Sequence, residues 1–348
     1  MQGSRSRSLD FLRACAIALV ITAHSVFAYG APPALAPLQL GGTGVDLFFV
    51  LSGWLLGSQL IRELTRDGNI ELKRFWIRRW MRTLPAYYAV LAVSMTQQVV
   101  MHPENPFRFD YLVFLQNYSG NLPFFGVSWS LCVEEHFYLL VGPAILALAR
   151  LRIEWRWILV AILLCLPTLF RLNGWFGSIE ETHVRWDGCM LGVALAVCRE
   201  RLPGLWGQLT RFAPLLAGIA FVLFAANLAD RYVDFLPIRD YDKSVYALIF
   251  AALLLLALRN DWWNHHLYLP GAHFIAVRAY SIYLVHPEVL ALLKRVGPHL
   301  PFPVFYALAW LGSLALAEGL YRLVEKPVMD LRDRLRSARQ PAVNANKA

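Results

Sequence analysis

Long apolar runs are the feature that most constrains the fold of this 348-residue chain. A helix needs roughly 17 to 25 apolar residues to cross about 30 Å of hydrocarbon, and runs of about this length recur along the whole sequence. We identify ten of them, at residues 9–30, 43–61, 83–101, 127–149, 157–172, 183–198, 212–229, 244–258, 272–293 and 302–324. Hydrophobic residues make up 57% of the chain and charged residues only 16%, below the share usual in soluble domains. The sequence therefore predicts an all-α integral membrane protein, a bundle of about ten transmembrane helices, within one of that number.

The positions of lysine and arginine predict how the bundle is oriented, because cytoplasmic loops carry an excess of them. With the N-terminus inside, 25 of the 33 basic residues fall on the cytoplasmic side. Both termini are then cytoplasmic. Residues 1–330 are predicted to form one transmembrane domain and residues 331–348 a basic, flexible tail on the anionic inner leaflet.

Charge and cysteine content exclude two classes of function. The formal net charge of +9 is explained by the positive-inside bias, and no nucleic-acid recognition motif accompanies the basic residues, so no nucleic-acid partner is expected. The five cysteines are odd in number and lack metal-ligand spacing, so no metal site is expected.

Two ionisable residues stand in the first run, "LDFLRACAIALVITAHS". Arg13 and His24 are eleven residues apart, which is close to three helical turns, so both point from one face at roughly 16 Å along the axis. Arg13 is either a functional cation or an anchor that reaches the cytoplasmic interface. His24 is either a hydrogen-bonded core histidine or a general base for a hydroxyl acceptor. The first run is expected to stay in the mature protein, because these two residues are atypical of a signal peptide.

An acidic residue begins the second run, "GGTGVDLFFVLSGWLLG". Asp46 is predicted to lie near the outer end of its helix, at a depth similar to that of His24. It either stabilises the helix N-terminus or pairs with His24 and fixes the imidazole tautomer, as the aspartate of a catalytic triad does.

A basic cluster lies at the cytoplasmic start of the third run, in "KRFWIRRWMRTLPAYY". The positive-inside bias explains most of its charge. Arg78, Arg79 and Arg82 have the three- and four-residue spacings that bring side chains together on a helix, which suits a ligand with several phosphates.

The fourth run carries the polar motif "SWSLCVEEHFYLL". Ser130, Glu134 and Tyr138 are four residues apart and are predicted to share one face, with Glu135 about 100° around the helix. The glutamates serve either chemistry or a structural ion pair. Further polar residues stand in other runs, where substrate contact and helix packing are equal alternatives: Arg185, Asp187, Tyr283 and His286.

Six stretches together resemble the acyltransferase-3 family of integral membrane proteins, which O-acylate cell-surface sugars and some secreted small molecules. They are Arg13-x10-His24, "GVDLFFVLSGWLL", "RRWMRTLPAYY", "SWSLCVEEHFYLL", "RWDGCMLGVALA", and "YSIYLVHP" with the closing "LVEKP". Each is weak alone, but the six in this order are specific and extend over nearly the whole chain. At His136 the family often has glutamine.

The resemblance implies a multi-pass protein of the bacterial cytoplasmic (inner) membrane, with acetyl-CoA or another acyl-CoA as donor and a carbohydrate or glycolipid hydroxyl as acceptor. It implies that Arg13 and His24 form the family's Arg/Lys-x10-His pair, that Arg79 and Arg82 form its R-x-x-R, and that Glu134 is the glutamate of its helix motif. A span of roughly 16 Å is comparable with an extended pantetheine arm, so phosphates held by the arginines would bring the thioester beside His24. We therefore predict that His24, Asp46 and Glu134 serve catalysis and that Arg13, Arg78, Arg79 and Arg82 bind the donor. The predicted acceptor-binding residues are Ser130, Tyr138, Arg185, Asp187, Tyr283 and His286.

Two other classes of protein stay open at this stage. A transporter or flippase of an acylated or anionic lipid-linked compound would also need buried charges, although we find no pair of broken helices in matching halves. A receptor or scaffold would need no base at His24. The sequence leaves the acceptor, the donor chain length, direct transfer against an acyl-histidine intermediate, and the oligomeric state undetermined.

Overall fold

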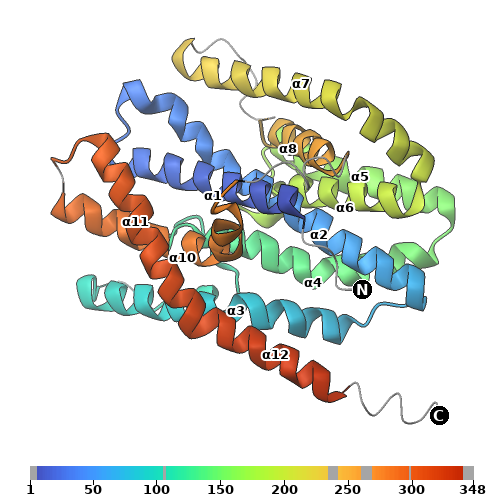
Figure 1. Ribbon diagram of the computed structural model, residues 1–348, viewed down its shortest axis with the longest axis horizontal. Coiled ribbons are helices and arrows are strands. Elements are labelled where there is room, and N and C mark those ends of the chain that lie inside the picture. The colour runs from blue at the N-terminus through green and yellow to red at the C-terminus, as the bar shows by residue number, and fades with distance from the viewer. Residues whose placement is uncertain (1–5, 105–106, 234–241, 260–268, 298, 340–348) are drawn as a thin grey trace.

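The computed structural model describes residues 6–104, 107–233, 242–259, 269–297 and 299–339, and every regular element among them is helical (Figure 1). The helices are α1 (Arg7–Ala28), α2 (Gly44–Asp67), α3 (Leu72–Met101), α4 (Ser128–Arg150), α5 (Ile153–Leu172), α6 (Asp187–Arg201), α7 (Pro203–Val233), α8 (Asp242–Arg259), α10 (Ala272–Val296), α11 (Phe302–Leu320) and α12 (Lys326–Arg339). Short turns of 3-10 helix form η1 (Pro33–Thr43), η2 (Phe109–Leu112), η3 (Gln116–Tyr118) and η4 (Thr182–Val184), and a π-helical turn, η5 (Tyr321–Glu325), joins α11 to α12.

Each of the ten apolar runs coincides with a helix, which confirms the all-helical membrane class. Seven segments of the described chain are long and apolar enough to cross a membrane. The helices α3, α6 and α8 are outside this set: α3 carries the basic cluster, and α6 has only 15 residues. The count of ten spans is therefore a prediction that length and composition alone do not establish.

Part of the predicted C-terminal tail is helical. Residues 331–339 belong to helix α12, in which basic and acidic residues such as Lys326 and Asp330 pair at four-residue spacing. The division at residue 330 into a transmembrane domain and a flexible tail stays a prediction. Residues 340–348 lie outside the described residues. The start of α1 and the end of α12 lie toward the same end of the bundle (Figure 1), in keeping with termini on one side of the membrane; the cytoplasmic identity of that side stays a prediction.

The closest helix contact joins α2 and α6, and it depends on glycine. Gly53 and Gly57 on α2, and Gly188 and Gly192 on α6, each form a glycine pair at four-residue spacing. A Cβ atom at Gly53 would lie 2.0 Å from the Cys189 carbonyl oxygen. One at Gly192 would lie 2.3 Å from the Val50 carbonyl oxygen. Small residues at this spacing let helix backbones approach closely in membranes, where van der Waals packing replaces the hydrophobic effect.

The helices α2 and α4 each begin beside the middle of a neighbouring helix and not beside its end. A Cβ atom at Gly44, the first residue of α2, would lie 2.3 Å from the Ala16 carbonyl oxygen, although α1 continues to Ala28. Gln116 donates hydrogen bonds to Ser128 at the start of α4 and to Tyr87, which lies far before the end of α3. The polar residues of the first turns of α2 and α4 are thereby placed inside the bundle.

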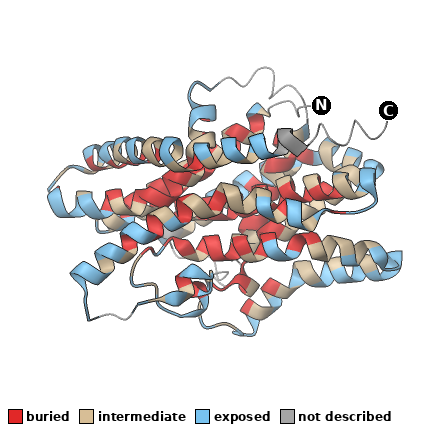
Figure 2. Cartoon of the chain, turned by 90° about the horizontal axis from the view of Figure 1, so that it is seen from below, coloured by how far each residue is buried: buried red, intermediate tan, exposed pale blue. Residues whose placement is uncertain are grey.

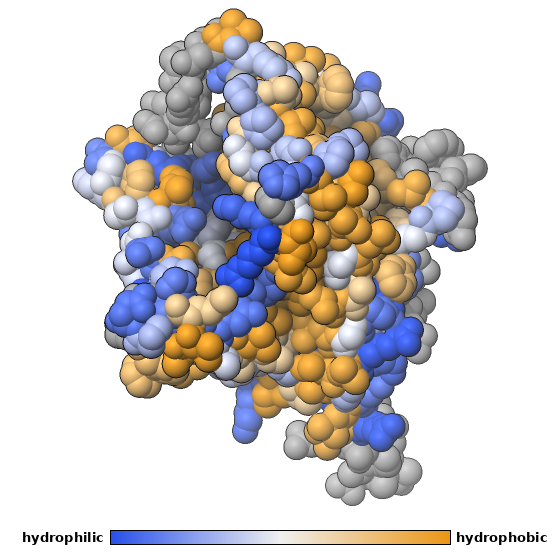
Figure 3. Space-filling view, turned by 90° about the vertical axis from the view of Figure 1, so that its left-hand side faces the viewer, coloured by the Kyte–Doolittle hydropathy of each residue, from blue (hydrophilic) through white to orange (hydrophobic). Residues whose placement is uncertain are grey.

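The exterior is apolar over the peripheral helices. Figure 2 shows buried residues concentrated along the centre of the bundle and exposed ones on its outer helices. Phe221 and Val222 on α7 and Trp155 on α5 are more than half exposed, as suits side chains that face lipid. Seen from the left-hand side of Figure 1, large apolar areas adjoin groups of hydrophilic residues (Figure 3).

Alanine at Gly192 is expected to lower the unfolding temperature of the detergent-solubilised protein, because the added methyl group collides with rigid backbone of α2. Such overpacking costs about 1–3 kcal/mol. Alanine at Gly218 on α7, where a Cβ atom would meet nothing within 4 Å, is the matched control and should leave that temperature unchanged or raise it. Equal unfolding temperatures for the two variants would contradict the proposed role of the α2–α6 contact.

Candidate active site

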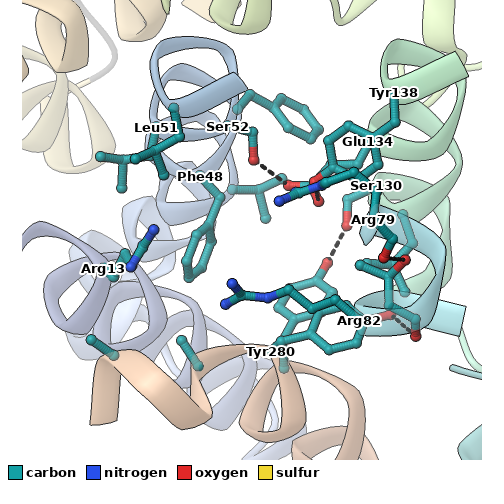
Figure 4. A pocket seen from close by; sticks show the side chains of 18 residues that line it. Arg13, Phe48, Leu51, Ser52, Arg79, Arg82, Ser130, Glu134, Tyr138 and Tyr280 are labelled. Atoms are coloured by element: carbon teal, nitrogen blue, oxygen red, sulfur yellow. Dashed lines mark hydrogen bonds between the residues drawn. The ribbon is translucent and has the colours of Figure 1, made fainter. Parts of the chain in front are cut away.

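A pocket opens between α1, α2, α3, α4 and α10, and its polar lining comes from seven of the predicted functional residues together with three polar residues that were not predicted. The lining residues are Arg13, Val45, Phe48, Phe49, Leu51, Ser52, Leu55, Arg79, Arg82, Thr83, Ser130, Leu131, Glu134, Tyr138, Ala276, Ala279, Tyr280 and Tyr283. Side chains from helices far apart in sequence therefore face one space (Figure 4).

Three guanidinium groups face this space. Arg13 comes from α1 and Arg79 and Arg82 from α3, where residues three apart share a helix face. Arg13 lies 3.8 Å from Asp10. Arg79 stacks over the Tyr138 ring at 4.4 Å, and its Nε atom is buried without a hydrogen-bond partner. Among the described residues, Arg82 has neither an ion pair nor a hydrogen bond, so the pocket has a surplus of positive charge.

Glu134 is the acid of the pocket. It accepts hydrogen bonds from Ser52 at 3.1 Å and from Tyr138 at 2.5 Å. The predicted common face of Ser130, Glu134 and Tyr138 is confirmed, since all three line the pocket. The neighbouring Glu135 points instead toward α3, where Thr83 donates a hydrogen bond to it at 2.8 Å.

Tyr283 closes one part of the pocket wall. Its hydroxyl lies 2.6 Å from Ser130 Oγ and donates to the Val127 carbonyl oxygen at 3.0 Å. Its ring also packs near the ring of His286, with centroids 5.6 Å apart. Tyr283 therefore contacts both the pocket and His286.

The predicted pair of His24 and Asp46 is wrong. Nδ1 of His24 lies 2.6 Å from Nε2 of His286 on α10, and the two rings stack with centroids 4.9 Å apart. Asp46 instead accepts from Arg185 at 2.9 Å. Similar depth in the membrane did not imply contact, because Asp46 sits on the face of α2 that packs on α6, away from α1.

Arg185 and Asp187 belong to buried polar networks. The Arg185 guanidinium, which neutralises Asp46, stacks over Trp129 at 5.0 Å. Asp187 accepts from Arg171 of α5 at 2.7 Å and from Ser244 of α8 at 2.9 Å. These contacts join α2, α4, α5, α6 and α8, so both residues hold helices together.

Six of the predicted site residues are absent from the described lining of the pocket: His24, Asp46, Arg78, Arg185, Asp187 and His286. Arg79, Arg82 and Thr83 line the pocket from α3, whereas Arg78 is outside the lining although it lies only about 40° around the helix from Arg82. The polar lining residues Ser52, Thr83 and Tyr280 were not predicted, although each stands within one of the stretches that carry the family resemblance.

Other ionisable residues found in the sequence form helix-to-helix pairs. Glu318 of α11 accepts from Arg278 of α10 and from Arg322 of η5, and Glu325 of η5 accepts from Ser281 of α10. Within the described residues, no cluster of three or more His, Cys, Asp or Glu has the arrangement of a metal site.

The fold and pocket define a helical membrane protein with a cationic pocket, and the comparison with known proteins gives its family. Residues 6–322 match the acyltransferase-3 family, described as an acyltransferase domain, so the chain belongs to that family. No solved structure matches it significantly.

Several curated proteins are similar to the chain. The peptidoglycan O-acetyltransferase OatA of Listeria monocytogenes is 24% identical over 92% of this chain and 55% of its own length. A Bacillus subtilis protein named "Putative peptidoglycan O-acetyltransferase YrhL" is 28% identical over 92% of this chain and 54% of its own. The chain thus spans about half the length of these relatives.

Asparagine at Asp46 is expected to destabilise the protein, because it leaves Arg185 as an uncompensated buried charge. Breaking one partner of a buried pair costs about 3–5 kcal/mol. Asparagine at Asp67, whose pair with Arg66 is exposed at the end of α2, should leave the free energy of unfolding nearly unchanged, because water solvates both charges. Thermal unfolding in nanodiscs measures both, and an unchanged D46N variant would show that the Asp46–Arg185 pair contributes little.

Proposed function

We propose that this protein is a membrane O-acyltransferase that takes an acyl group, most simply acetyl, from cytoplasmic acyl-CoA and transfers it to a hydroxyl group of an extracytoplasmic glycan. The observation that carries the proposal is the pocket in which Arg13, Arg79 and Arg82 meet Glu134 in the interior of a helical bundle. Family membership supports the chemistry, and relatives named for peptidoglycan O-acetylation support a cell-wall glycan as acceptor.

The charge of the pocket suits the donor. Acyl-CoA carries several phosphate charges at one end and an uncharged thioester at the other. Arginine binds phosphate through paired, charge-assisted hydrogen bonds. Arg82 is half-buried and has no ion pair or hydrogen bond within the described part of the chain, so an anion would stabilise it. The apolar part of the lining, which includes Phe48 and Leu55, suits the pantetheine arm.

The proposed base is His24, which lies one turn before the end of α1 and is half-buried. Tyr283 lines the pocket, and its ring packs near that of His286, the partner of His24. The proposal therefore includes a movement of the Tyr283 side chain that opens the acyl end of the pocket toward His24.

In the proposed reaction, His24 accepts the proton of the acceptor hydroxyl, and the hydroxyl oxygen attacks the thioester carbonyl carbon to form the new C–O bond. The C–S bond of the tetrahedral intermediate then breaks, and the CoA thiolate takes the proton back from His24. The rival route, attack by His24 itself to form an acyl-histidine, is distinguished by mass spectrometry of the quenched enzyme after a reaction without acceptor.

Alanine at Arg79 or at Arg82 is expected to weaken acetyl-CoA binding about 10- to 100-fold each, since each loses charge-assisted hydrogen bonds worth about 1.5–3 kcal/mol. Equilibrium binding to protein in nanodiscs provides the measurement. Arg78→Ala is the matched control on the same helix and should bind within about twofold of wild type, because its side chain is outside the pocket. Unchanged binding in the R79A/R82A variant would remove the donor assignment and favour the transporter class.

Alanine at His24 is expected to abolish transfer of radiolabelled acetyl groups while leaving acetyl-CoA affinity unchanged, because the residue is outside the donor pocket. General base catalysis contributes about 10²- to 10⁴-fold to rate. Full transfer by this variant, measured against a hydroxyl acceptor such as a cell-wall glycan fragment, would contradict the role of His24.

A further inference from the structure

The geometry of the contact between His24 and His286 restricts which ring nitrogens carry hydrogen. The two rings are nearly parallel, with an interplanar angle of 8°, and a nitrogen of each is within hydrogen-bond distance of the other. His286 is fully buried, and its second nitrogen, Nδ1, lies 3.2 Å from the backbone carbonyl oxygen of Ile282, one helical turn earlier.

These contacts fix the hydrogen positions of both rings. A carbonyl oxygen only accepts hydrogen bonds, so Nδ1 of His286 must carry the hydrogen that it donates to Ile282. In a neutral imidazole the other nitrogen is then an acceptor, which makes Nε2 of His286 the acceptor. The hydrogen in the 2.6 Å contact therefore belongs to Nδ1 of His24, and Nε2 of His24 is left with its lone pair.

His286 orients the His24 ring as the aspartate of a catalytic triad orients its histidine, but His286 is uncharged. An aspartate partner fixes the tautomer and holds a negative charge beside the ring. A neutral imidazole fixes the same tautomer without placing a second buried charge in an apolar bundle, where an unpaired charge is costly. When His24 gains a proton at Nε2 during transfer, the positive charge that forms on its ring is stabilised through the hydrogen bond from Nδ1 to the acceptor nitrogen of His286.

We propose that His286 is a positioning residue: the Ile282 carbonyl, His286 and His24 form a hydrogen-bonded relay that holds His24 in the Nδ1–H tautomer and presents Nε2 as the reactive lone pair. From the sequence, we expected His286 to bind the acceptor; its contacts with His24 and Ile282 instead support a positioning role. The inference rests on the proposed function for the use of the lone pair, but the tautomer itself is a property of the resting protein.

The direct test is the nitrogen NMR spectrum of histidine-labelled protein in nanodiscs. His24→Ala identifies the His24 signals by their loss. We expect the wild-type protein to show a protonated Nδ1 and an unprotonated Nε2 at His24, and His286→Leu to lose this preference. An Nε2-protonated His24 in the wild type, or the same tautomer in the leucine variant, would overturn the inference whether or not the protein transfers acyl groups.

Kinetics provide a second test. His286→Leu should lower kcat about 10²-fold or more, with KM for acetyl-CoA and the affinity for it unchanged. His286→Gln, whose amide oxygen is able to accept from Nδ1 of His24, should restore most of kcat. Leucine at His102, an exposed histidine at the end of α3, is the matched control and should have wild-type kcat.

The outcomes separate this inference from the proposed function. If H286L and H286Q lose kcat equally while H286Q folds normally, the relay is wrong. If the wild-type protein transfers no acetyl group, the proposed function fails, and the NMR result alone decides the tautomer.

Discussion

The high cost of an unpaired charge in an apolar bundle is the constraint on which this structure depends. The interior meets it by pairing: Arg185 with Asp46, Arg171 with Asp187 and Ser244, and Arg278 with Glu318. Breaking such a pair leaves a charge that neither water nor lipid solvates. The pocket differs, because Arg13, Arg79 and Arg82 all face it and Glu134 is the one acid in its described lining. In the proposed function, an anionic donor balances this positive charge.

The second organising constraint is close backbone contact. The glycine pairs on α2 and α6 bring these two helices together, and Asp46 and Arg185 meet at one end of the same contact. The ion pair and the small residues thus support one interface. Because α2 also supplies Ser52 and Phe48 to the pocket, the α2–α6 contact holds one wall of the proposed donor site in place.

The third feature is the separation of the two halves of the proposed reaction. The arginines and Glu134 face the pocket, whereas His24 contacts His286, whose ring packs near that of Tyr283. A closed arrangement of this kind would keep water from an activated thioester until an acceptor is present. The family match supports acyl transfer. The residues proposed to bind the donor and to act as base come from different helices, so the transfer would need several helices.

The class of the protein could be predicted from the sequence alone, because a long apolar run satisfies its backbone hydrogen bonds in a membrane only as a helix, and the length of each run can be counted in the sequence. The sequence also determined which residues of one helix share a face: Ser130, Glu134 and Tyr138 line the pocket as the helical period requires. Periodicity carries no information on which helices are neighbours. The tertiary structure alone therefore decided that Asp46 meets Arg185 and that His24 meets His286. These partners lie more than a hundred residues apart, and only helix packing, set here by glycine contacts and buried charge, brings them together.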